Sequence, residues 1–129
     1  MSKTTLFDPA KAAVIHLADE TQFSDSGIVS RALHDQAGVR ATLFAFAAGQ
    51  ELTEHATPAR ALLQILSGAC EVTLAGKKTV LRAGDLLHMP PNLPHAVHAT
   101  EAFSMLLITI RERAAASVPG AAIPPTPGA

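Results

Sequence analysis

Two histidines, His55 and His95, are the side chains of this sequence best suited to chemistry. Each belongs to a short block opened by a glycine, residues 49–57 and residues 84–95. A neutral imidazole can ligate a divalent metal ion or orient a polar ligand by hydrogen bonding. Two imidazoles alone leave a first-row metal dependent on water, substrate or other side chains for its remaining positions. The pair therefore predicts either polar anchors for a small molecule or an incomplete metal site.

The aromatic composition and the charge disfavour several other functions. The 129 residues contain no Tyr, no Trp and only five Phe, so a phenolic general acid is excluded and base-stacking platforms are disfavoured. Ten Lys and Arg side chains against eleven Asp and Glu give a formal net charge of −1, which supplies no basic field. We therefore expect no nucleic-acid partner and no membrane partner.

Cysteine usage and the N-terminal composition predict a soluble cytoplasmic protein. The single cysteine, Cys70, cannot form an intramolecular disulfide, so nothing indicates an oxidising compartment. Residues 1–8 are polar and lack the apolar region of a signal peptide, and no apolar run approaches the ~20 residues of a membrane span. Cys70 shares its predicted strand face with Val72 and Leu74, which indicates a small buried residue rather than a nucleophile.

Short apolar and β-favouring runs separated by glycine and proline dominate the chain. We predict strands in the runs 13–17, 27–34, 39–47, 61–66, 70–74, 79–81, 86–89 and 103–110. Turn signals about every eight to twelve residues are typical of an all-β sandwich or barrel. Helix is expected only at 8–13, where Asp8 and Pro9 resemble an N-cap followed by proline at the first helical position.

The composition divides the chain into a barrel domain, residues 1–110, and a tail, residues 111–129. The tail is rich in Ala, Pro and Gly and has no hydrophobic periodicity. Such a composition predicts either a disordered tail or an extended polyproline-like arm, and an arm would pack on its own barrel or on a neighbouring subunit.

The two blocks resemble the two conserved motifs of the cupin family, whose domains are small β-barrels. The positions that match these motifs at the family's spacing are Gly49, His55 and Gly68 in the first and Gly84, Pro90 and His95 in the second. Gly76 marks the expected hairpin between the motifs. The resemblance covers residues 40–110 and implies an all-β, cupin-type jelly-roll or double-stranded β-helix barrel with a short N-terminal extension.

The sequence departs from the family pattern at the metal ligands. Thr57 stands where the family has its second histidine, Ala61 stands where it has the glutamate, and Asn92 and Ala99 replace a later glycine and asparagine. The resemblance therefore implies two of four expected ligands, the two histidines. A divalent Fe, Mn, Ni or Zn ion on this pair would be held loosely.

Strand alternation predicts which side chains share a cavity with the two histidines. Thr57 follows His55 by two residues, and Leu63 lies on the same face of the next strand as Ala61 and Ile65. The resemblance places residues an even number before His95 in the cavity, so His88 faces outward. The predicted ligand-binding residues are His55, Thr57, Leu63, Leu87, Met89 and His95.

The other polar candidates are assigned structural or exposed positions. Asp85 follows Gly84 in a tight turn, where a short carboxylate accepts backbone N–H bonds. A solvated rim is expected for Glu51 and Glu54, and solvent or a subunit interface for His88 and His98; His16 and His34 are given no role.

These residues support two functional hypotheses. The first is a small cupin that binds a small molecule in an apolar barrel cavity, oriented by His55 and His95. The alternative is a metal-dependent cupin enzyme of the dioxygenase, isomerase or decarboxylase type, which rests on fold-level analogy. We also expect a homodimer, because the run 103–110 is more apolar than one face of a small barrel requires.

Overall fold

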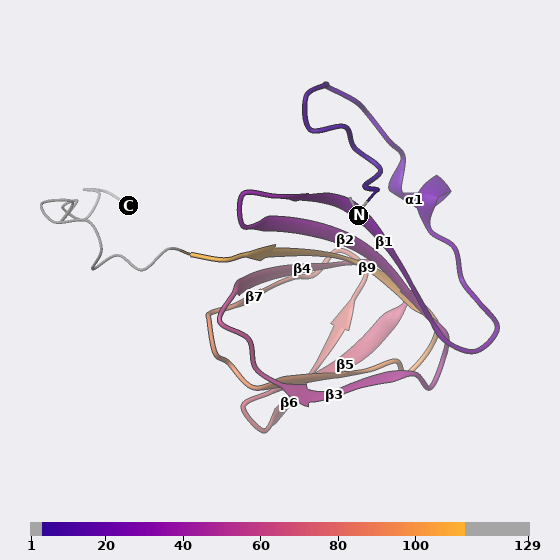
Figure 1. The fold of residues 1–129 in the computed structure, drawn as a ribbon. Coiled ribbons are helices and arrows are strands. Elements are labelled where there is room, and N and C mark those ends of the chain that lie inside the picture. Colours follow the sequence, from indigo (N-terminus) through magenta and orange to yellow (C-terminus); the bar gives the residue numbers. More distant parts are fainter. Residues whose placement is uncertain (1–3, 113–129) are drawn as a thin grey trace, which may run out of the picture.

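Nine strands and one short helix form residues 4–112, the part of the chain that the computed structural model describes (Figure 1). In chain order they are α1 (Leu17–Glu20), β1 (Ile28–Gln36), β2 (Val39–Phe46), β3 (Glu51–His55), β4 (Arg60–Ser67), β5 (Ala69–Leu74), β6 (Lys77–Arg82), β7 (Leu86–Met89), β8 (His95–His98) and β9 (Phe103–Ile110). They make two antiparallel sheets, ordered β1-β2-β9-β4-β7 and β3-β8-β5-β6. The prediction of an all-β barrel is confirmed.

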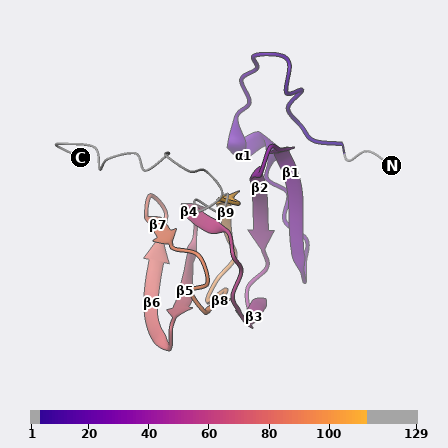
Figure 2. The same cartoon turned by 60° about the vertical axis from the view of Figure 1, so that its left-hand side comes forward.

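The core lies between the two sheets, which face each other in Figure 2. Phe46 on β2 and Phe103 on β9 are register partners, fully buried, and their rings stack with centroids 4.6 Å apart. Ile65 from the first sheet and Val72 from the second belong to the same buried cluster. In the absence of Trp and Tyr, phenylalanine, methionine and aliphatic side chains fill this interior.

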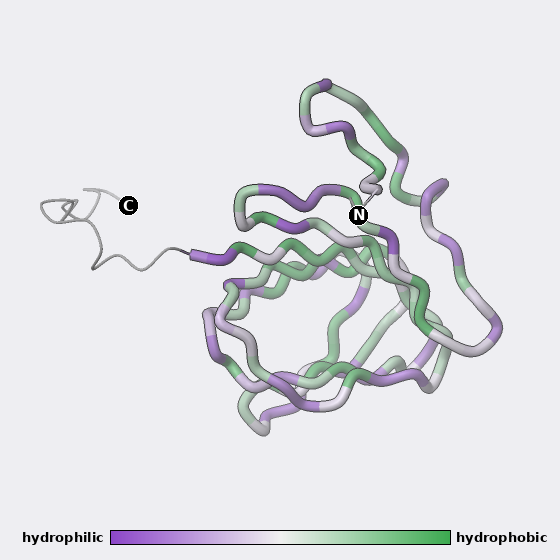
Figure 3. Tube along the Cα trace, viewed as in Figure 1, coloured by the Kyte–Doolittle hydropathy of each residue, from purple (hydrophilic) through white to green (hydrophobic). Residues whose placement is uncertain are grey.

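Strands β2 and β9 carry long apolar stretches, which are green in Figure 3. The outer face of the five-stranded sheet is also apolar, because the register pairs that point away from the core include Leu43 with Leu106 and Ala41 with Ile108. The segment before β1 covers part of it: Leu6 and Phe7 donate backbone hydrogen bonds to the carbonyls of Ala32 and Leu33, each 3.0 Å long. Leu33 and Leu43 are consequently buried although they face away from the barrel interior. Two apolar faces explain why β2 and β9 do not show a simple alternating pattern.

Two predictions for the N-terminal segment were wrong. The expected helix at 8–13 is a turn, in which the Asp8 carboxylate accepts a 2.9 Å hydrogen bond from the Ala10 N–H and the Asp8 carbonyl accepts one from the Lys11 N–H. The expected strand at 13–17 is absent, and α1 begins at Leu17. This short apolar run pairs with no described strand, and Val14 is 88% exposed.

Strands β3 and β8 were missing from the predicted strand runs. Their sequences, ELTEH and HAVH, are polar or rich in histidine, and local propensity for them is weak. They form because β8 pairs with both β3 and β5 in the four-stranded sheet. The hairpin expected at Gly76 is confirmed between β5 and β6, with Ala75 and Gly76 at φ of 49° and 86°.

The predicted tail, residues 111–129, lies outside the described residues apart from Arg111 and Glu112. Within residues 4–112 no helix is long and apolar enough to cross a membrane.

Candidate functional site

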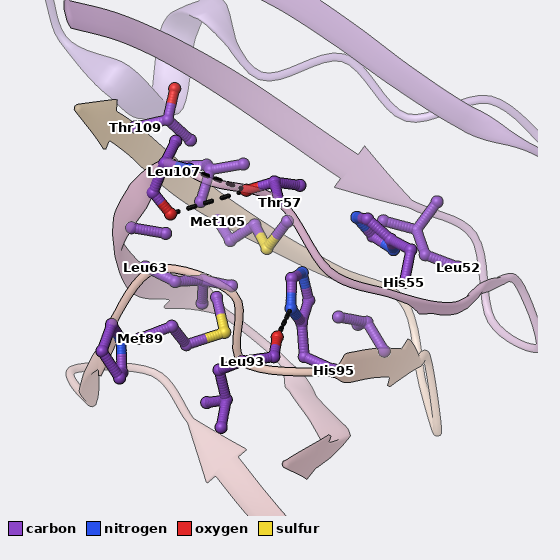
Figure 4. Close-up of a pocket in the computed structure, with 14 residues that line it drawn as sticks. Leu52, His55, Thr57, Leu63, Met89, Leu93, His95, Met105, Leu107 and Thr109 are labelled. Carbon is purple, nitrogen blue, oxygen red and sulfur yellow. Dashed lines mark hydrogen bonds between the residues drawn. The ribbon is translucent and has the colours of Figure 1, made fainter. Parts of the chain in front are cut away.

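A cavity of about 100 Å³ opens between the two sheets (Figure 4). Strands β3, β4, β7, β8 and β9 and the loops between β3 and β4 and between β7 and β8 contribute its walls. The lining residues are Leu52, His55, Thr57, Ala59, Ala61, Leu63, Met89, Pro90, Leu93, His95, Val97, Met105, Leu107 and Thr109. Most of this lining is apolar, and its polar side chains are two histidines and two threonines.

The two histidines are brought together by strand pairing. His55 ends β3, His95 begins β8, and the two are register partners in the four-stranded sheet. Their ring centroids lie 4.4 Å apart, with the planes inclined at 56°. The expectation that both imidazoles face one cavity therefore agrees with the structure, although forty residues separate them in the sequence.

Both imidazoles are held by the same local hydrogen bond. Nδ1 of His55 lies 3.1 Å from the carbonyl oxygen of Thr53, and Nδ1 of His95 lies 2.8 Å from that of Leu93. A carbonyl oxygen only accepts, so each Nδ1 must carry the hydrogen that is donated. In the neutral imidazole the lone pair is then on Nε2. The site consequently offers two Nε2 acceptors with fixed ring orientations.

The loops next to the two histidines are joined by a hydrogen bond. The Asn92 N–H donates a 2.7 Å hydrogen bond to the carbonyl of Thr57, which joins the β7–β8 loop to the β3–β4 loop. Asn92 has a φ of 69°, a conformation that asparagine tolerates better than most residues, and this explains how it can replace the family's glycine. His55 is exposed and His95 half-buried, so the pair lies at the mouth of the cavity.

The two threonines of the lining lie in different parts of the cavity, and the Thr57 hydroxyl has local hydrogen-bond partners. The Thr57 hydroxyl accepts a hydrogen bond from the Ala59 N–H at 3.3 Å and lies 3.5 Å from the Ala59 carbonyl. It thus stabilises a local turn, although the side chain still lines the cavity. Thr109 lies on the opposite side of the cavity from the histidines in Figure 4.

The donor set does not fit a complete protein-ligated metal site. Thr57 and Ala61, at the positions of two family ligands, both line the cavity, and neither supplies an imidazole or a carboxylate. Within residues 4–112 no group of three or more His, Cys, Asp or Glu side chains is placed to hold a metal ion. The described cavity lining therefore supplies two imidazoles as its only side chains of the kinds that usually ligate a divalent metal ion.

All but one of the six predicted ligand-binding residues line the cavity. The exception is Leu87, which the sequence reasoning placed in the lining. It is the register partner of Leu63, and on the edge strand β7 it packs against the buried core cluster instead. Strand parity correctly gave the face of Leu87, but parity does not say where along that face the core ends and the cavity begins.

The sequence reasoning did not assign several lining residues to the site. β9 contributes Leu107 and Thr109, which alternate with outward-facing residues that are also apolar, so periodicity could not separate the two faces. Met105 lines the cavity and also belongs to the buried core cluster. The other residues not assigned are Leu52, Ala59, Pro90, Leu93 and Val97.

The remaining polar candidates lie away from the cavity. His88 is exposed, and its Nε2 lies 2.7 Å from Nη1 of Arg60. His98 lies 3.9 Å from the Glu51 carboxylate. The Asp85 carboxylate accepts a 2.8 Å hydrogen bond from the Arg82 N–H, which agrees with a structural role in the turn.

Cys70 is fully buried in the core, as expected from its strand face. Desolvation of the thiolate raises the pKa of this thiol from 9.0 to about 11. The side chain is therefore a neutral thiol at physiological pH and a poor nucleophile.

Comparison with known proteins gives a consistent family assignment. A family model described as "Cupin domain" matches residues 42–111. A conserved protein of unknown function from Streptococcus pyogenes is 32% identical, with a TM-score of 0.77 over 88% of this chain and 98% of that one. A cupin superfamily protein from Desulfitobacterium hafniense is 26% identical, with a TM-score of 0.76 over 86% and 100% of the two chains.

A third solved structure, a cupin 2 conserved barrel domain protein from Leptotrichia buccalis, is 34% identical with a TM-score of 0.71. The alignment covers 74% of this chain but only 47% of that larger one. None of the curated proteins compared with the chain matches it in sequence.

Proposed function

The chain belongs to the cupin family, and we propose that its jelly-roll barrel binds a small molecule in the apolar cavity, oriented by His55 and His95. The observation that carries this proposal is the pair of imidazoles at the mouth of an otherwise apolar cavity, each fixed through Nδ1. Ligand sites in proteins combine mostly apolar walls with a few placed polar groups. The size of the cavity and the hydrogen bonding of the histidines restrict which small molecules can bind.

The cavity volume limits the enclosed part of the ligand. About 100 Å³ is less than the roughly 150 Å³ of an engineered apolar cavity that holds benzene, so the enclosed part comprises only a few carbon atoms. Met89 and Met105 line the cavity, and their unbranched side chains can adjust to ligands of slightly different shape.

The hydrogen bonding of the histidines supports a ligand with a hydrogen-bond donor at its polar end. Both Nε2 atoms accept, so a neutral ligand must donate a hydrogen bond to them, as a hydroxyl does. A ligand that carries only acceptors at this end would leave a partly desolvated Nε2 without a partner, which lowers affinity.

A metal-dependent enzyme of the dioxygenase, isomerase or decarboxylase type is the alternative function. The observation in its favour is that metal-bound histidines commonly donate their other ring N–H to a backbone carbonyl, as both imidazoles do here. The two ligands would leave the other positions of Fe, Mn, Ni or Zn to water or substrate. Elemental analysis of untagged protein tests this: one equivalent of metal that is lost on His95→Ala favours the enzyme.

The proposed location is the cytoplasm. Cys70 is the single cysteine of the sequence and is buried as a free thiol, which suits a reducing compartment.

Binding of 1-butanol and of its methyl ether, followed by calorimetry or ligand-observed NMR, tests the ligand proposal. We expect the alcohol to bind more tightly, because only the alcohol donates to Nε2. His55→Ala and His95→Ala should remove this preference, whereas His16→Ala should keep it, because no side-chain contact of His16 and no cavity wall depends on that residue in the described structure. Equal binding of both probes would contradict the assigned role of the histidines.

A further inference from the structure

A second hollow, of about 370 Å³, adjoins the cavity at the end away from the histidines. Its lining residues are Asp35, Gly38, Arg40, Ala59, Thr109 and Arg111. Ala59 and Thr109 line both spaces, so the cavity and this hollow share a wall at these two residues. Unlike the cavity, the hollow is lined mainly by polar and charged groups.

Arg40 occupies an unusual position for a charged side chain. It lies on β2 with the same strand parity as Phe44 and Phe46, which pack in the core, and β2 pairs with β9 without a bulge. The inward-facing row of β2 therefore ends in a guanidinium, opposite its register partner Thr109. An arginine in this row at the rim brings positive charge to the end of the barrel without burying it, because the side chain is half-exposed.

Arg111 brings a second guanidinium to the same hollow. Its backbone N–H donates a 2.8 Å hydrogen bond to the Gly38 carbonyl, which fixes the start of its side chain next to the β1–β2 turn. The nearby Arg60 is engaged elsewhere, 2.8 Å from the Glu112 carboxylate and 2.7 Å from His88. Arg111 has no ion-pair partner within residues 4–112.

The charges of the hollow leave a positive excess. Arg40 Nε lies 3.9 Å from the Asp35 carboxylate, so this carboxylate neutralises part of the field. Two guanidinium groups against one carboxylate nevertheless leave one unit of positive charge beside the cavity. A planar guanidinium suits a carboxylate because its N–H groups can donate two parallel hydrogen bonds.

We propose that the ligand is a short ω-hydroxy carboxylate, whose hydroxyl donates to the histidines and whose carboxylate lies between Arg40 and Arg111. Its alkyl chain occupies the apolar cavity and passes the side chains of Ala59 and Thr109. In Figure 4, Thr109, which also lines the hollow, and the two histidines lie on opposite sides of the cavity. This inference rests on the proposed function and adds the anionic end of the ligand.

The test compares 6-hydroxyhexanoate with 6-hydroxyhexanamide, which has the same chain and no charge. Affinities are measured by ligand-observed NMR or calorimetry at low and high salt. We expect the carboxylate to bind about five-fold more tightly at low salt, since partly exposed charge pairs contribute modestly and are screened. Shorter and longer ω-hydroxy carboxylates, from about four to eight carbons, then define the chain length that fits.

The matched variants are Arg40→Gln, Arg111→Gln and, as the control, Arg82→Gln. Arg82 is exposed and lines neither space, so its variant should keep the five-fold preference for the carboxylate. The variants at Arg40 and Arg111 should each reduce the preference and together remove it, with unchanged circular dichroism. Equal affinity of the carboxylate and the amide for the unmodified protein overturns the anionic end but leaves the cavity proposal standing. Failure of both compounds and of 1-butanol to bind overturns both.

Discussion

At the scale of single residues, the hydrogen bonds of Nδ1 distinguish His55 and His95 from a chance pair of surface histidines. Nδ1 of each ring is hydrogen-bonded to the backbone carbonyl two residues earlier in the chain. The two motifs therefore have the same local hydrogen bond although their sequences differ. A ring fixed in this way presents one nitrogen to the cavity without an entropic cost at the moment of binding. The fixed orientation of the two rings therefore favours ligand binding.

The tautomer of the two histidines is a direct prediction. For the neutral rings of His55 and His95 we expect ¹H–¹⁵N spectra to show the Nδ1–H tautomer. The carbonyl acceptors stabilise this Nδ1–H tautomer, which is the less populated one in a free histidine side chain. An Nε2–H signal from either ring would contradict the assignment of free Nε2 acceptors.

The buried thiol predicts how stability depends on pH. Because the pKa of Cys70 rises from 9.0 to about 11 on folding, the unfolded chain loses its proton first as pH increases. The free energy of unfolding should therefore be unaffected by this group below pH 9.0 and should fall between pH 9.0 and about 11. This loss amounts to about 3 kcal/mol.

Urea unfolding of the wild type and of Cys70→Ala, each from pH 8 to pH 11, checks this prediction. Other groups titrate in the same range, so the informative quantity is the difference between the two pH profiles. If both proteins lose stability in parallel, the thiol does not contribute.

At the scale of elements, Gly68 fixes the turn between β4 and β5. Its φ is +74°, and a Cβ at this position would lie 2.9 Å from Cα and Cβ of Phe103 and would also clash with the carbonyl of Ala102. Gly76 has a similar φ of +86° but open space around it. The two glycines therefore separate the cost of backbone strain from the cost of steric overlap.

We expect Gly76→Ala to destabilise the fold by about 1–2 kcal/mol, the cost of a left-handed alanine. Gly68→Ala carries the same strain and in addition displaces Phe103, so it should cost at least twice as much. Chemical denaturation of the two variants measures the difference. Equal destabilisation would mean that the backbone around Phe103 moves aside freely.

Strands with a β-favouring composition were predictable, and strands held only by their neighbours were not. The runs that became β2, β4 and β9 are largely apolar and bounded by turn signals, so the sequence pattern and the pairing agree. β3 and β8 carry glutamate and histidine and depend on the register of the sheet. The lining of the cavity could be predicted only in part. Alternation identifies the face of a strand, whereas the position of a void depends on packing between two sheets.

At the scale of the whole molecule, the outer face of β4 and β9 remains only partly covered. Its outward-facing side chains include Leu62, Leu106, Ile108 and Ile110, each half-buried within one chain. We propose that two chains pack through this face as a homodimer, because an apolar sheet face of this kind is seldom left in water.

Light scattering at micromolar concentration should give twice the chain mass of 13.4 kDa. Ile108→Lys should shift the mass toward the monomer, because it buries a charge in the proposed interface. Thr79→Lys is the matched control, since Thr79 is an exposed residue of β6 in the other sheet and the variant should remain dimeric. A monomeric wild type would refute the dimer and would leave the cavity proposal unaffected.

The most direct test of ligand binding uses Met89 and Met105, which line the cavity. In ¹³C-methyl spectra, titration with 1-butanol should shift the signals of both residues along saturable curves with one shared dissociation constant. If the two cavity methyls do not move, or if they move without saturation, the cavity is not a binding site for small molecules.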